Sequence, residues 1–313
     1  MSFSSDVKNE LAQVKDAKSC CQLSELGGLY GTMGSLSLLG RGRVNAQLSS
    51  ESMAVCRRAY TLLQSALGLS PQIHYVSSAR FGGTRKAVLT LGPLQSPALL
   101  RALRMMEEDG TLRATSPRLS LTRGCCARAF LRGVMLGGGT MSSPEQGYHL
   151  ELACRSQDMQ ALTAKCMQRV GLPVHLSARR DHIYLYLKQS EQVVTFLTAI
   201  GAHSSVMQIE DLRVKRQVMG AVNRAMNCDS ANLQKQMDAS SAQVRAIRRL
   251  RDEGILATLP PSLQAMAMAR LDAPEASLEQ LGQQLKPPIG KSGANHRMRR
   301  LMNYAQELKE DEP

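Results

Sequence analysis

The stretch CCQLSELGGLYGTMG at residues 20–34 returns as CCARAFLRGVMLGGG at residues 125–139. The Cys-Cys pair, one Leu and two Gly match in register between the two copies. Both copies are apolar, and their small residues are spaced for close helix packing. A repeat of about a hundred residues is longer than the unit of a solenoid, so it predicts two similar half-domains. We therefore expect each copy to form a helix that packs against the other.

The segments that follow each copy occur in the same order in both halves. Gly68 and Gly171 stand where helices are expected to end in a left-handed turn. Each half is therefore expected to have the order α-β-α-β-β-α, which predicts a pseudo-twofold α+β domain over residues 1–210. The expected helices are 3–14, 20–34, 52–67, 97–106, 125–139, 158–170 and 193–200, and the expected strands are 44–48, 73–76, 86–91, 148–153, 174–176 and 183–187.

Composition and charge favour a globular protein with a polyanionic partner. The chain has 313 residues, of which 43% are hydrophobic, and its formal net charge is +13. Lys and Arg exceed Asp and Glu both within residues 1–210 and within residues 211–313. A basic balance of this kind favours nucleic acid as a partner. The polar start and the lack of a long apolar run predict a cytoplasmic protein with no membrane span.

The eight cysteines indicate reduced thiols rather than a metal centre. No two of them form a C-x-x-C pair, and adjacent cysteines are poor joint ligands for one tetrahedral zinc ion. From the sequence we expect no metal site, no cofactor and no catalytic cysteine.

Residues 211–256 change in character and predict a basic helical linker. Apolar residues recur there at helical spacing, and Lys and Arg are frequent among them. Asn232, Ser240 and Ser241 are expected to break the helix or to cap its segments.

Residues 257–313 predict an all-α unit with a helix-turn-helix layout. Ser277 is expected to cap one helix, and Gln280 three positions later completes a capping box. Lys286-Pro287-Pro288-Ile289-Gly290 cannot be helical, because proline lacks an amide donor. A second helix should follow, capped by Ser292.

The second of these helices has a polar and basic first half that suits a DNA groove. Between Lys286 and Tyr304 there are five Lys and Arg and no acidic residue. Asn and Arg can form bidentate contacts with adenine and guanine, whereas arginines to the side of this face suit phosphates. The alternative is an ordinary basic helical hairpin with a solvated face. The candidate DNA-binding residues are Ser277, Lys286, Lys291, Ser292, Gly293, Asn295, His296, Arg297, Arg299 and Arg300.

The repeated helix resembles the LAGLIDADG motif of homing endonucleases. That resemblance implies two helices packed at a pseudo-twofold axis, with an acidic metal ligand just before the last glycine of each. Met33 and Gly138 occupy those positions and supply no oxygen ligand for a hard divalent cation. The glycines of the motif are therefore assigned to helix packing; these are Gly28, Gly34, Gly133 and Gly139. A metal-dependent endonuclease with a rearranged site, using Glu151 for example, is the alternative.

Motifs spread over nearly the whole chain point to one family; they are 2–11, the two Cys-Cys helices, 148–151, 200–203, 222–224, 227–232 and 291–297. Together they resemble the WhiA family of bacterial transcriptional regulators. The resemblance implies a degenerate LAGLIDADG-like domain, a C-terminal helix-turn-helix domain, binding to double-stranded DNA, and roles in cell division, chromosome segregation and, in spore formers, sporulation. It leaves open the oligomeric state and the transcription or cell-division proteins that the N-terminal domain would contact.

Overall fold

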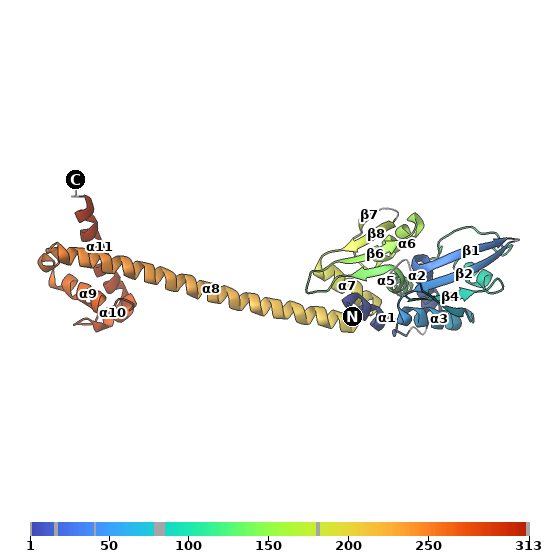
Figure 1. Ribbon diagram of the computed structural model, residues 1–313, viewed down its shortest axis with the longest axis horizontal. Coiled ribbons are helices and arrows are strands. Elements are labelled where there is room, and N and C mark those ends of the chain that lie inside the picture. Colours follow the sequence, from blue (N-terminus) through green and yellow to red (C-terminus); the bar gives the residue numbers. More distant parts are fainter. Residues whose placement is uncertain (1, 16–17, 41, 78–84, 180–181, 311–313) are drawn as a thin grey trace. The chain divides into compact units, whose positions relative to one another are not determined.

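The computed structural model describes residues 2–15, 18–40, 42–77, 85–179 and 182–310. The chain divides into two compact units, Met1–Lys215 and Arg216–Pro313, each with its own hydrophobic core (Figure 1).

The first unit consists of two halves with the same order of elements, preceded by helix α1 (Phe3–Leu11). Each half runs helix, two strands, helix, two strands, helix. The elements of the first half are α2 (Ser19–Met33), β1 (Gly34–Gly40), β2 (Arg43–Ser50), α3 (Met53–Leu67), β3 (Gln72–Ser77), β4 (Arg85–Leu91) and α4 (Ser96–Ala102). Those of the second are α5 (Gly124–Gly138), β5 (Gly139–Met141), β6 (Leu150–Cys154), α6 (Gln157–Arg169), β7 (His175–Arg179), β8 (His182–Leu187) and α7 (Ser190–Ile200).

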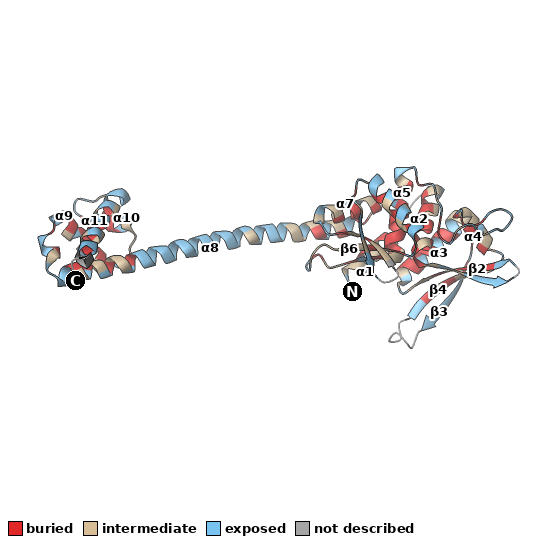
Figure 2. Ribbon diagram, turned by 90° about the horizontal axis from the view of Figure 1, so that it is seen from above, coloured by how far each residue is buried: buried red, intermediate tan, exposed pale blue. Residues whose placement is uncertain are grey.

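Within the described residues, the two halves build antiparallel sheets of identical topology. The strand order is β1-β2-β4-β3 in one sheet and β5-β6-β8-β7 in the other. Alternation along β2 and β6 points one set of side chains into the core and leaves the other face open. The duplicated helices α2 and α5 lie among the most deeply buried elements, as Figure 2 shows. The predicted α+β class and pseudo-twofold architecture are confirmed.

The expected order of elements missed the first strand of each half. β1 and β5 begin directly at Gly34 and Gly139, whose extended backbones (φ −76°, ψ 153° and φ −80°, ψ 145°) end the preceding helices. No strand was expected here, because a helix that passes into a strand without a loop leaves no separating signal in the sequence. The helix ends were better predicted: Gly68 closes α3 with φ 67°, and Gly171 has φ 79°.

Helix α8 (His203–Asp252) runs for 50 residues without interruption. The breaks expected at Asn232, Ser240 and Ser241 are therefore wrong. The hydroxyl of Ser240 donates to the carbonyl of Pro274 rather than to a carbonyl of its own helix. An i,i+4 hydrogen bond of 2.9 Å from Gln234 to Asp238 further supports the helical conformation.

The second unit packs short helices around the C-terminal end of α8. A 3₁₀ turn (Ile255–Thr258) leads into α9 (Pro261–Asp272), α10 (Leu278–Gln284) and α11 (Lys291–Glu310). Fully or almost fully buried apolar side chains from α8, α9, α10 and α11 form its core; they include Ile247, Leu250, Leu263, Met266, Leu281, Met298 and Leu301. Among the residues that the structure describes, no helix combines the length and apolar character needed to cross a membrane.

Candidate nucleic-acid interface

Helices α2 and α5 touch backbone to backbone at two glycines. A Cβ atom on Gly28 would lie 2.3 Å from the carbonyl oxygen of Phe130, and one on Gly133 would lie 2.0 Å from that of Glu25. Real Cβ contacts are never this short, so only glycine fits at either position. Gly34 and Gly139 instead lie against the last turns of their own helices, facing Tyr30 and Met135. They serve the passage from helix to strand rather than the contact between helices.

The helix ends that would hold a nuclease metal carry no carboxylate. Met33 is buried, with 3% of its surface exposed. A side chain at Gly138 would meet Thr32 and the carbonyl of Ala153. Sulfur ligands do gather at the opposite ends of these helices, where Cys20, Cys21 and Cys126 lie together.

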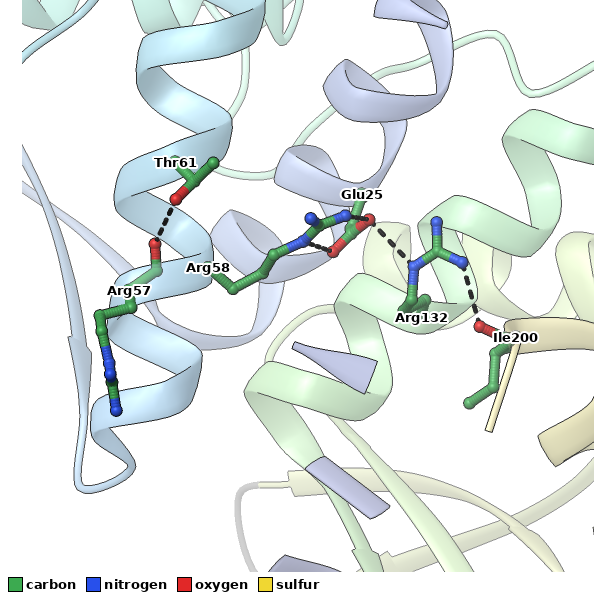
Figure 3. Close-up of polar contacts among 6 residues, drawn as sticks. All are labelled: Glu25, Arg57, Arg58, Thr61, Arg132 and Ile200. Carbon is green, nitrogen blue, oxygen red and sulfur yellow. Dashed lines mark hydrogen bonds and ion pairs between the residues drawn. The ribbon is translucent and has the colours of Figure 1, made fainter. Parts of the chain in front are cut away.

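A fully buried carboxylate sits between the two central helices, held by two arginines (Figure 3). Glu25 on α2 accepts from Arg58 on α3 through two 2.7 Å hydrogen bonds. Its second oxygen also accepts from Arg132 on α5 at 3.0 Å, and Arg132 donates onward to the carbonyl of Ile200 on α7 at 3.0 Å. The network therefore ties four helices of both halves together, and it occupies both oxygens of the carboxylate.

The sequence did not indicate this network. Its only signal was an asymmetry between the copies, because Glu25 in the first aligns with Phe130 in the second. The two arginine partners lie far from Glu25 along the chain, so only the folded structure brings the three together.

The carboxylate of Glu151 also has two side-chain partners, a histidine and an arginine. It lies on the open face of β6, 2.8 Å from Nε2 of His149 and 2.8 Å from a guanidinium nitrogen of Arg179. The same face carries aromatic rings with cations over them: Arg179 over Tyr184 at 5.6 Å, and Lys188 over Tyr186 at 4.9 Å. The open side of the second sheet thus presents rings and positive charge.

In the second unit, a short turn joins α10 to α11, and the turn packs against α10. Ser277 caps α10, and the reciprocal bonds with Gln280 form the expected capping box. Lys286–Gly290 leave the helix, and a Cβ on Gly282 would lie only 2.4 Å from the carbonyl oxygen of Ile289. Gly282 therefore lets the turn fold back onto α10, a role that the sequence analysis missed.

Helix α11 begins at Lys291, so Ser292 lies within its first turn. A capping residue has to precede the helix, so the cap expected at Ser292 is wrong. Met298 and Leu301 are buried and Met302 is half-buried. The candidate side chains cover the other side: Lys291, Ser292, Gly293, His296, Arg299 and Arg300 are exposed, and Asn295 and Arg297 are half-buried.

The remaining two candidates are set apart from this face. Lys286 is exposed in the turn before α11. Ser277 is half-buried, and its hydroxyl accepts from the amide of Gln280, so its local role is to cap α10.

Known proteins match the chain along almost its whole length. Models of the WhiA N-terminal LAGLIDADG-like domain, the WhiA LAGLIDADG-like domain and the WhiA C-terminal HTH domain match residues 19–105, 127–219 and 222–305. A "probable cell division protein WhiA" of Heliobacterium modesticaldum is 38% identical, covering 98% of this chain and 96% of the relative. Its counterpart in Symbiobacterium thermophilum is 37% identical, covering 98% of each.

A solved structure shows the same architecture. The crystal structure of full-length DUF199/WhiA from Thermotoga maritima superimposes with a TM-score of 0.60 at 26% identity, covering 98% of this chain and 99% of that one. The match covers both the domain with two sheets and the helical unit with the helix-turn-helix layout of this chain. This chain therefore belongs to the WhiA family.

Proposed function

We propose that this protein binds double-stranded DNA and reads its sequence through the first half of α11. The observation that carries the proposal is the outer side of Lys291–Arg300, which combines exposed basic and polar side chains with no acidic residue. A helix of this kind enters the major groove, where arginine and asparagine reach base edges. Arg299 and Asn295 are assigned to base contacts, and Arg297 and Arg300 to phosphates.

Binding measurements on two arginine variants test this assignment. Genome-wide immunoprecipitation of the full chain would first supply a bound sequence. Arg299→Ala should then lose about 1–3 kcal/mol on that sequence and relax its preference over unrelated DNA. Arg300→Ala, the matched control, should weaken binding to all sequences alike and reduce the salt dependence. An equal loss on every sequence for Arg299→Ala would make that residue a phosphate contact instead.

The N-terminal unit is assigned a supporting role in the same function. The cations and rings on the open face of the second sheet, among them Arg179 and Lys188, suit sequence-independent phosphate contacts. The same unit could instead present a surface to transcription or cell-division proteins, which pull-downs with residues 1–210 and 211–313 would separate. The relatives' name supports a role in cell division. We extend the proposal to a nucleoid-associated, cytoplasmic regulator that also acts in chromosome segregation and, in spore formers, in sporulation.

We assign no nuclease activity to the protein. Met33 and Gly138 offer no hard oxygen ligand, and the carboxylates of Glu25 and Glu151 are bound by arginines. The competing function is a metal-dependent endonuclease with a rearranged site. Incubation with supercoiled plasmid and Mg²⁺ or Mn²⁺ distinguishes them, because nicking that is lost in Glu151→Gln would establish the enzyme.

A further inference from the structure

Four cysteine side chains gather where the two central helices begin, two from each half of the repeat. Cys20 and Cys21 are the second and third residues of α2, and Cys125 and Cys126 hold the same places in α5. The sulfur atoms of Cys20, Cys21 and Cys126 all lie within 4.8 Å of one another. Cys125 directly precedes Cys126 in the first turn of α5, and the Cys21 thiol lowers the pKa of the Cys125 thiol, so the fourth sulfur adjoins the same cluster.

Adjacent cysteines can share a metal ion when a second helix supplies further sulfur ligands. Two neighbouring side chains of one helix diverge, and alone they would make a poor chelate. Here the partner helix supplies the missing ligand directions, since Cys126 approaches both Cys20 and Cys21. In a tetrahedral zinc site with bonds of about 2.3 Å, sulfur atoms stand about 3.8 Å apart. The observed upper limit of 4.8 Å is about 1 Å longer than that spacing.

The surroundings suit the negative charge of a metal–thiolate centre. Both helices start here, and their first amides carry partial positive charge. Neither N-cap residue, Lys18 or Arg123, covers those amides with its side chain. Both N-cap residues are themselves cationic and directly precede the helix starts that carry the thiols. Cys20 and Cys125 are half-buried while Cys21 and Cys126 are buried, which leaves a path for an ion to enter.

We propose that Cys20, Cys21, Cys125 and Cys126 bind one thiophilic metal ion of the Zn²⁺ class, joining the two half-domains at the N-terminal ends of their central helices. Sulfur ligands select borderline and soft ions over Mg²⁺ and Ca²⁺. The site lies at the opposite helix ends from Met33 and Gly138, so it is structural and separate from the nuclease positions of the fold.

Metal titration of the full, reduced chain tests this proposal. The protein should retain one Zn²⁺ per chain through gel filtration, measured by elemental analysis. Co²⁺ should replace it and give sulfur-to-cobalt charge-transfer bands together with the intense visible bands of tetrahedral coordination. Added Zn²⁺ should also raise the unfolding temperature, because the ion binds the folded state.

Variants separate this site from the other thiols. Cys126→Ser and Cys20→Ser should each lose the tetrahedral Co²⁺ spectrum, and circular dichroism would verify that they fold. Cys228→Ser changes an exposed thiol on α8, and this variant should bind Co²⁺ and Zn²⁺ as the unmodified chain does. The proposal is overturned if the reduced chain takes up no stoichiometric Co²⁺ or Zn²⁺, or if both cluster variants keep the full spectrum. DNA binding by α11 is scored separately and does not depend on either result.

Discussion

At the scale of single residues, the interface between α2 and α5 depends on the lack of a side chain at two glycines and on the buried side chain of one glutamate. Gly28 and Gly133 let the backbones meet, and the carbonyl of Glu25 lies where a side chain at Gly133 would go. The side chain of the same Glu25 then gathers two arginines. Removing one member of such a buried group is costly because the remaining charges stay buried.

Gly133→Ala should destabilise the first unit by about 2 kcal/mol or more, since the added methyl would overlap the carbonyl of Glu25 and force the helices apart. Urea unfolding followed by circular dichroism measures the loss. Gly124→Ala is the control in the same helix, because a Cβ there meets nothing within 4 Å. Equal stability of the two variants would show that the helices do not approach as described.

Alkaline pH should weaken the fold through the buried thiols. Burial raises the pKa of Cys166 to about 12 and that of Cys154 to about 11. The folded state holds these protons more tightly than the unfolded chain, so the stability they contribute is present below pH 9 and is lost as pH rises through the folded values.

The measurement is the free energy of unfolding at a series of pH values from neutrality upward. Cys166→Ala should weaken the alkaline loss, whereas Cys228→Ala, at an exposed thiol, should leave it unchanged. A pH profile identical in both variants would assign the loss to other groups.

At the scale of elements, local signals decide where helices end and contacts decide how they lie. Ser277 and Gln280 form their capping box within four consecutive residues. The turn that follows is defined by proline chemistry, but its path depends on the approach of Ile289 to Gly282. The relation of α11 to α10 is therefore a tertiary property of the helix-turn-helix layout.

Ser277→Ala should cost about 1 kcal/mol in the stability of the second unit, because the first turn of α10 loses an acceptor for its free amides. Hydrogen exchange of the α10 and α11 amides in the full chain resolves this unit from the first. Gln283→Ala changes an exposed residue of the same helix and should have little effect. Unchanged protection in Ser277→Ala would mean that the cap does not stabilise α10.

At the scale of the whole molecule, the two units have separate cores and share one helix, α8. Most residues from Lys215 to Ala239 are exposed. Their helical conformation is therefore supported by backbone bonds and neighbouring side chains rather than by a core. Apolar residues along this stretch, such as Val218, Met219 and Val222, also remain exposed.

Asn227→Pro should open α8 locally at a cost of about 3 kcal/mol while both units stay folded. Limited proteolysis should then cut near residue 227, and amide exchange should accelerate in the preceding turn. Asn227→Ala keeps the amide donor and should remain protected. If the unmodified chain were already cut and unprotected there, the continuous helix would be wrong.

The sequence by itself determined the duplication, the fold class, most helices and strands, the capping box of α10 and the composition of α11. Each of these depends on neighbours along the chain, on periodicity, or on a motif repeated in register. It missed β1 and β5, because Gly34 and Gly139 change the backbone from helix to strand without a loop. It also predicted breaks in α8 that the structure does not have. The partner of the Ser240 hydroxyl, the carbonyl of Pro274, lies 34 residues further along the chain and could not be foreseen from the sequence.

Only the tertiary structure joined Glu25 to Arg58 and Arg132, and Cys20 and Cys21 to Cys126. These groups are formed by residues that are distant in sequence, and the separation of two residues along the chain does not predict the distance between them in the fold. The approach of α2 to α5, which two glycines permit, brings both groups together. The repeated segment thus indicated that two helices would pair, while the folded chain decided which charges and thiols that pairing would enclose.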